Sequence, residues 1–122
     1  MASPDEVAKA FVGHYYQTFA TNRDALVSLY QEQSKLTWEG QQFLGAQAIV
    51  QKFKALPFQN VRHDISVVDA QPSPSGGITL MVNGKLLAEG EQHPLQFSQM
   101  FHLMPINNSF VVTNEIFRLC YG

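Results

Sequence analysis

Four histidines and one cysteine are the side chains of this sequence best suited to metal binding or nucleophilic chemistry, and their spacing supports neither. The histidines are His14, His63, His93 and His102. No two of them stand four residues apart on a predicted helix with an acid between, the spacing that binds zinc in metalloproteases. Cys120 is single, which excludes an internal disulfide and suits a reducing compartment. We therefore predict no metal site and no cofactor.

Neighbouring polar residues that could act together in catalysis are also poorly placed. His63 and Asp64 are neighbours in a predicted strand, and so are Asn114 and Glu115. Adjacent residues of a strand point to opposite faces, so neither pair can easily interact. The glycines form no phosphate-binding loop, and the serines form no nucleophile elbow. The sequence therefore predicts a protein that is not an enzyme.

An enzyme remains the less favoured alternative. Three helices and a bent sheet can enclose a conical pocket for proton transfer on a small apolar substrate, as in an isomerase or dehydratase. The acid or base would then be Asp69, His63 or Tyr15. No pair of titrating groups must converge in such a pocket, which is why binding is preferred over catalysis.

Composition indicates one compact domain over residues 1–122. The chain is 45% hydrophobic and 15% charged, which is too apolar for a disordered chain. The net charge is -2 and the eight basic residues are scattered, so no basic stripe is available for nucleic acid. No signal peptide and no apolar run of about 18 residues is present, so we expect no membrane insertion.

Three helices are predicted in the first half of the chain. Ser3-Pro4-Asp5-Glu6 combines a capping hydroxyl, a proline at the first helical position and a glutamate three residues after the cap. Apolar residues then recur every four positions from Val7 to Phe19, which is typical of a helix packed on a core. A second helix is expected from Asn22 to Gln33, and a third from Ala46 to Leu56, where Pro57 stops it.

Strands follow wherever the apolar period changes to two. Leu36 and Trp38 alternate with polar residues, and a short strand at Gln42 to Leu44 follows a glycine turn. The remaining strands are predicted as a meander over Val61 to Ala70, Ile78 to Ala88, Phe97 to Met104 and Phe110 to Leu119. Helices followed by antiparallel strands indicate an α+β fold with the helices on one face of the sheet.

Both faces of the predicted sheet carry apolar side chains. Phe97 and Phe101 lie on one face of their strand and Met100 on the other, and Met81 similarly opposes Leu80. Helices cover one face only. A second copy of the chain is the commonest cover for the other, so a homodimer is favoured over a sheet that closes on itself within one chain.

Six short segments, in order along almost the whole chain, resemble the nuclear transport factor 2 family. They are His14-Tyr15-Tyr16, Leu36-Thr37-Trp38-Glu39-Gly40-Gln41-Gln42-Phe43, Leu56-Pro57-Phe58-Gln59, Asp69-Ala70-Gln71-Pro72, Gln99-Met100-Phe101 and Phe117-Arg118-Leu119. The resemblance implies a cone of three helices on a strongly bent antiparallel sheet, paired sheet to sheet as a homodimer.

The resemblance further implies a non-enzymatic carrier of the GDP-bound GTPase Ran. Such a carrier moves between cytoplasm and nucleus, is concentrated at the nuclear envelope, and contacts the phenylalanine-glycine repeats of nucleoporins. A module of the same fold that binds other phenylalanine-containing peptides is the alternative.

The resemblance also assigns sites by position. The pocket that receives an aromatic side chain of Ran would be formed by Trp38, Leu56, Val61, Met81, Leu86 and Met100. The acidic rim would be formed by Glu39, Glu89 and Glu91, the last two at positions where many members have aspartates. The dimer face would contain Met81, Met100, His102 and Ile116. Residues Ser3 to Val7 lack the tryptophan with which animal members hold nucleoporins, so Val7, Gln71, Pro72 and Pro74 are the expected nucleoporin groove.

Overall fold

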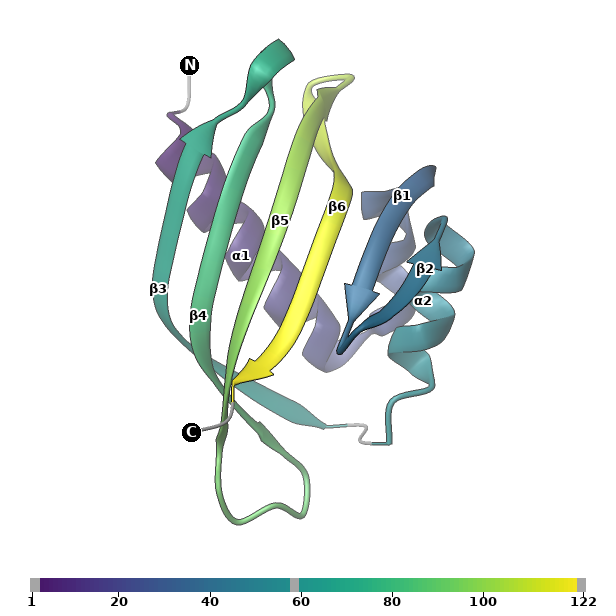
Figure 1. The fold of residues 1–122 in the computed structure, drawn as a ribbon, viewed down its shortest axis with the longest axis vertical. Helices are drawn as coiled ribbons and strands as arrows, with labels where there is room; N and C mark the ends of the chain where they lie inside the picture. Colours follow the sequence, from purple (N-terminus) through teal and green to yellow (C-terminus); the bar gives the residue numbers. More distant parts are fainter. Residues whose placement is uncertain (1–2, 58–59, 121–122) are drawn as a thin grey trace.

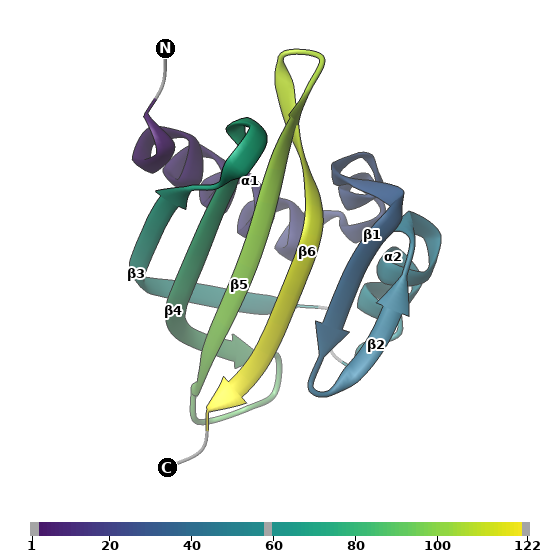
Figure 2. The same cartoon turned by 45° about the horizontal axis from the view of Figure 1, so that its top comes forward.

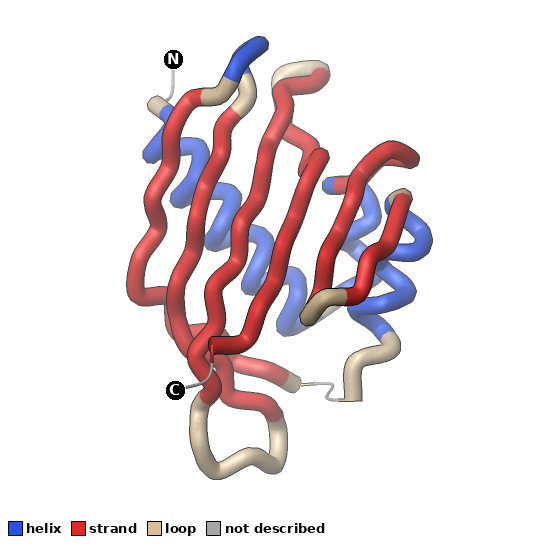
Figure 3. The backbone as a smooth tube through the Cα atoms, in the orientation of Figure 1, coloured by secondary structure: helices blue, strands red, loops and turns tan. Residues whose placement is uncertain are grey.

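A computed structural model describes residues 3–57 and 60–120, so Phe58 and Gln59 of the motif above lie outside the described residues. The elements are α1 (Pro4–Thr21), the 3-10 helix η1 (Arg23–Leu29), β1 (Tyr30–Trp38), β2 (Gln41–Leu44), α2 (Ala46–Lys54), β3 (Val61–Pro72), the 3-10 turn η2 (Pro74–Gly76), β4 (Ile78–Ala88), β5 (Leu95–Ile106) and β6 (Ser109–Cys120). Figures 1 and 3 show the helices on one side of the sheet and its other side open. The predicted α+β fold with three helices is confirmed.

Helix α1 begins where the sequence predicts. The Ser3 hydroxyl accepts the Glu6 main-chain N–H, and the Glu6 carboxylate accepts the Ser3 N–H, each at 3.2 Å. Two N–H groups that have no partner inside the helix are thereby satisfied. The predicted apolar stripe is buried against the sheet, with Tyr15 and Phe19 at most 2% exposed.

The prediction of a second helix from Asn22 to Gln33 is wrong in its last turn. The 3-10 helix ends at Leu29, and residues 30–33 already belong to β1. Partners distant in sequence hold the two ends of this segment in the sheet. The Tyr30 hydroxyl donates to Glu115, and the hydroxyl of the next residue after the segment, Ser34, donates to the Val112 carbonyl at 2.6 Å. Tertiary contacts therefore override a local helical pattern. The third helix likewise ends at Lys54, two residues before the predicted end.

The six strands are ordered β2-β1-β6-β5-β4-β3. The predicted antiparallel meander from β3 to β6 is confirmed, but β1 runs parallel to β6, so the sheet is mixed. Figure 2 shows β3 bending sharply across the end of the sheet. The β3–β4 register shifts between Ile65 and Val67, and a Cβ on Gly84 would lie 2.4 Å from the Asp64 carbonyl oxygen. Glycine at position 84 therefore permits the bend that makes the cone.

The two faces of the sheet differ as the alternating pattern predicts. Leu80, Val82 and Phe101 face the helices and are at most 1% exposed. Met81 and Ile116 point to the open face, where each is 46% exposed. Among residues 3–57 and 60–120, no helix is both long and apolar enough to cross a membrane.

Candidate functional site

The three predicted rim acids lie at one end of the molecule. Glu39 is in the turn between β1 and β2, and Glu89 and Glu91 follow β4 in the loop to β5. Figures 1 and 2 both show this turn and this loop at the same end of the sheet, and Figure 1 shows the end of α1 close to the turn. We call this end the mouth.

A hollow of about 420 Å³ lies at the mouth. It is lined by Ala20 of α1, by Asn60 to Arg62 where β3 begins, and by Leu87 to Glu91. The Glu89 N–H donates to the Asn60 carbonyl at 2.9 Å, and the Asn60 side-chain amide donates to the Glu89 carboxylate. The Glu91 N–H donates to the Ala88 carbonyl at 3.0 Å. Main-chain bonds thus fix two exposed acids beside a hollow.

Four of the predicted pocket residues lie on the helix-covered side of the sheet. Trp38 stacks on Phe117, with ring centroids 4.0 Å apart, and meets the edge of Phe53 at 5.6 Å. Like Trp38, the residues Leu56, Val61 and Leu86 are 6–8% exposed, so all four are packed in the core. Of these four, Val61 alone lines the hollow at the mouth. An entering aromatic ring would therefore have to displace side chains to reach Trp38.

The structure does not bring Met81 and Met100 together with these four residues. They pair with each other across β4 and β5, on the open face, whereas Leu86 faces the helices. Met100 also pairs with Ile116, which places Met81, Met100 and Ile116 in one row across three strands. His102 lies on the same face, where its ring nitrogens contact the hydroxyls of Ser73 at 2.8 Å and Thr113 at 2.6 Å. The four predicted dimer-face residues are therefore together.

Next to this row the open face is hollowed. A cavity of about 590 Å³ is lined by residues of β1, β2 and β6 together with Met100 of β5. Leu44 at its edge is 63% exposed. Apolar side chains that share one face and are open to solvent mark a surface for a protein partner.

A buried polar cluster, which was not among the predicted sites, lies between α1 and the sheet. The Glu115 carboxylate is 1% exposed and accepts hydrogen bonds from the hydroxyls of Tyr15 (2.7 Å) and Tyr30 and from the Gln99 side-chain amide (2.6 Å). The Tyr16 hydroxyl donates to Gln99. Burial raises the pKa of Glu115 to about 7, although the hydrogen bonds act in the opposite direction. The alternation with Phe117 was the available signal that Glu115 points inward.

The residues considered for catalysis do not converge. Asp69 pairs with Met81 and is exposed on the open face, while Tyr15 belongs to the buried cluster. The His63 ring lies 4.6 Å from that of Tyr16, and its Nδ1 has no hydrogen-bond partner among the described residues. Burial, with a smaller effect from Arg23, lowers the pKa of His63 to about 4. Within residues 3–57 and 60–120, no three His, Cys, Asp or Glu side chains are grouped to hold a metal ion.

The predicted nucleoporin residues lie at the end opposite the mouth. Figures 1 and 2 show the start of α1, the end of β3 and the short helical turn η2 at the same end of the sheet. Val7 is half-buried on α1, and Gln71, Pro72 and Pro74 are exposed. The single chain thus brings the four positions to one end.

Comparisons with known proteins give one consistent result. Residues 7–119 match the profile described as "Nuclear transport factor 2 (NTF2) domain". The chain is 60% identical to nuclear transport factor 2 of Oryza sativa subsp. japonica over 97% of this chain and 98% of that protein. It is 49% identical to nuclear transport factor 2 of Saccharomyces cerevisiae over 95% and 94%. The solved nuclear transport factor 2 of Cryptosporidium parvum is 51% identical and superposes with a TM-score of 0.91 over 96% and 94% of the two chains.

Proposed function

Because this chain belongs to the nuclear transport factor 2 family, we propose that it binds the GDP-bound GTPase Ran at its mouth and carries it into the nucleus. The relatives are named nuclear transport factors, and the chain is likewise a non-enzymatic nuclear transport protein. The observation that carries the Ran proposal is the hollow at the mouth, where Glu89 and Glu91 flank an apolar surface that includes Val61 and Leu87.

Pocket and rim contribute differently to such a complex. Burying a phenylalanine ring contributes about 1.5–3 kcal/mol, whereas an exposed ion pair contributes about 0–1 kcal/mol. An aromatic side chain of Ran that enters between Val61 and the turn at Gly90 would supply most of the affinity. The acids would chiefly raise the association rate and select a basic partner.

Binding to Ran in its two nucleotide states tests the proposal. Titration calorimetry with Ran loaded with GDP, and separately with a GTP analogue, is expected to show binding of the GDP form only. Equal binding of both forms, or none, would contradict the carrier and favour a module that recognises other phenylalanine-containing peptides.

Reversing one rim charge is expected to weaken this binding. In Glu91→Lys, like charges would face each other across the interface, so the dissociation constant for GDP-bound Ran should rise about tenfold at low salt, or about 1.4 kcal/mol. The effect should shrink at physiological ionic strength because salt screens exposed charges. Surface plasmon resonance at two salt concentrations measures it. Glu32→Lys makes the same charge change at an exposed position of β1 away from the mouth, and an equal effect there would refute a local role for Glu91.

We propose that two copies pair through the open face. Met81, Met100 and Ile116 form its central row, and the adjacent hollow between β1, β2 and β6 adds apolar surface. A partner sheet would cover the exposed parts of Met81 and Ile116, which no element of the described chain covers. The mouth opens at the end of the sheet, so pairing leaves it accessible.

Nucleoporin repeats are proposed to bind at the end opposite the mouth, between Val7 and the segment from Gln71 to Pro74. Such contacts would concentrate the protein at the nuclear envelope during exchange between cytoplasm and nucleus. In Val7→Asp, a charge replaces a half-buried apolar side chain, so retention of a phenylalanine-glycine repeat peptide should fall at least about threefold, since burying the exposed half of a valine contributes about 0.7 kcal/mol or more. Ala10→Asp adds the same charge at an exposed position of α1 and should bind normally. Normal binding by Val7→Asp would refute this groove.

A further inference from the structure

Glu39 occupies an unusual backbone position at the mouth. Glu39 and Gly40 form the two-residue turn between Trp38 and Gln41, with φ values of 52° and 85°. This turn type suits the twist of paired strands, but a left-handed φ is unfavourable for a residue with a Cβ. Glycine, asparagine or aspartate is the usual choice there. A glutamate at this position indicates that its side chain makes compensating contacts.

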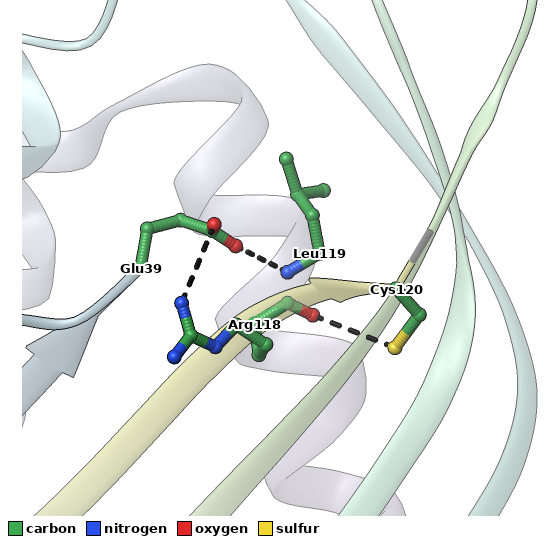
Figure 4. A network of polar contacts seen from close by, with 4 residues as sticks. All are labelled: Glu39, Arg118, Leu119 and Cys120. Carbon is green, nitrogen blue, oxygen red and sulfur yellow. Dashed lines mark hydrogen bonds and ion pairs between the residues drawn. The ribbon is translucent and has the colours of Figure 1, made fainter. Parts of the chain in front are cut away.

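Those contacts are made with the end of β6, as Figure 4 shows. The Glu39 N–H donates to the Phe117 carbonyl at 3.1 Å, which continues the parallel β1–β6 ladder by one bond. In a regular ladder the Leu119 N–H would next donate to the Glu39 carbonyl. Because the left-handed turn ends β1 here, the Glu39 carboxylate accepts the Leu119 N–H instead. The side chain thus replaces a main-chain acceptor.

Arg118 holds the second carboxylate oxygen more loosely. Its Nη1 lies 3.8 Å from Oε2 of Glu39, and the two side chains are 62% and 29% exposed. The same nitrogen would lie 3.9 Å from a Cβ on Gly40, so the guanidinium covers the turn. A distant, solvated ion pair contributes little, whereas a hydrogen bond from a main-chain N–H to a carboxylate is directional and strong. Arg118 is therefore the contact that can be exchanged.

We propose that Arg118 is a specificity-determining residue that occupies Glu39 in the free protein and is replaced there by a basic side chain of GDP-bound Ran. This inference rests on the proposed function. The Leu119 N–H keeps one oxygen of Glu39 in place and so orients the carboxylate, while Oε2 passes from Arg118 to the partner. Since Arg118 must be displaced and also repels a basic partner, it lowers the affinity and favours partners whose basic group competes well with a guanidinium.

The test is a titration of GDP-bound Ran with Arg118→Gln, which keeps a polar side chain and removes the charge. We expect binding about three- to fivefold tighter at low salt, with a smaller gain at physiological ionic strength. Lys9→Gln is the matched control, because it changes the net charge equally at an exposed position of α1 near its start. In a Glu39→Gln background, Arg118→Gln should give a smaller gain than in the unaltered protein, because no carboxylate is left for Arg118 to occupy.

The outcomes separate the two proposals. If the unaltered protein does not bind GDP-bound Ran, the proposed function fails and this inference falls with it. If it binds, but Arg118→Gln binds equally or more weakly than the Lys9→Gln control, Arg118 is not a competitor and only this inference is overturned. Thermal unfolding of each variant checks that the exposed substitution leaves the fold intact.

Discussion

Replacing Glu115 with glutamine is expected to abolish the loss of stability that ionisation of Glu115 causes between about pH 4.5 and pH 7. The pKa of Glu115 is raised from 4.5 to about 7 in the folded chain because its carboxyl group is buried. Below pH 4.5 both states are protonated and burial has no ionisation cost. As pH rises to 7, the unfolded state releases the proton first, so the free energy of unfolding falls by about 3 kcal/mol. Above pH 7 the loss is complete.

His63 changes stability in the opposite direction over part of this range. The pKa of His63 is lowered to about 4 in the folded chain. Its contribution to the free energy of unfolding is therefore fully present above pH 6.5 and is lost as pH falls towards 4. The pH dependence of the unaltered protein alone would mix the two groups. His63 is unchanged in Glu115→Gln, so the difference between the two proteins isolates Glu115.

Urea unfolding at several pH values between 4.5 and 7.5 measures this difference. Glu115→Gln should become more stable relative to the unaltered protein as pH rises, by about 3 kcal/mol over the range. Glu32→Gln makes the same chemical change at an exposed position and should run parallel to the unaltered protein. Parallel curves for Glu115→Gln would show that Glu115 stays ionised across this range in the folded chain.

The elements that local chemistry determines were predictable from the sequence. The cap at Ser3 and Glu6 defines the start of α1, and the limits of β4 agree with the prediction at both ends. Residues 30–33 were not predictable in the same way, because Leu26, Leu29 and Tyr30 also fit a helical face. Their strand state depends on Glu115, which lies 85 residues beyond Tyr30 in the sequence. The parallel pairing of β1 with β6 is likewise a long-range choice.

The candidate site was predictable to the extent that strand alternation was applied. Alternation separates Met81 from Leu86 along β4, so a residue on the open face cannot also line a pocket beneath the helices. The family resemblance places Met81 and Met100 both in the pocket and on the dimer face. The same rule points Glu115 inward with Phe117, but acids are so rarely buried that an exposed position is the ordinary expectation for such a residue. Three partners on α1, β1 and β5 make that acid tolerable.

The open face leads to the second large effect. In Ile116→Glu, a charge would lie in the central row of the proposed dimer, opposite apolar side chains of the second copy. Burial of an unpaired carboxylate costs several kcal/mol, so the dimer dissociation constant should rise at least about a thousandfold, or about 4 kcal/mol. Ile116 is 46% exposed in the single chain, and a glutamate there stays solvated when the copies separate. The monomer should therefore keep its fold.

Sedimentation velocity at micromolar concentration distinguishes a folded monomer from a dimer. Leu95→Glu is the control, since Leu95 is 41% exposed but lies two residues before the buried Phe97, on the side of β5 that faces the helices and not on the open face. It should remain a dimer. A dimeric Ile116→Glu would place the seam elsewhere. The residues that line the hollow at the mouth do not include Met81, Met100 or Ile116 of the proposed seam, so the Ile116→Glu monomer should bind GDP-bound Ran within about twofold of the dimer, because a difference below about 0.4 kcal/mol is expected for a distant site. Loss of that binding would instead mean that the partner copy shapes the mouth.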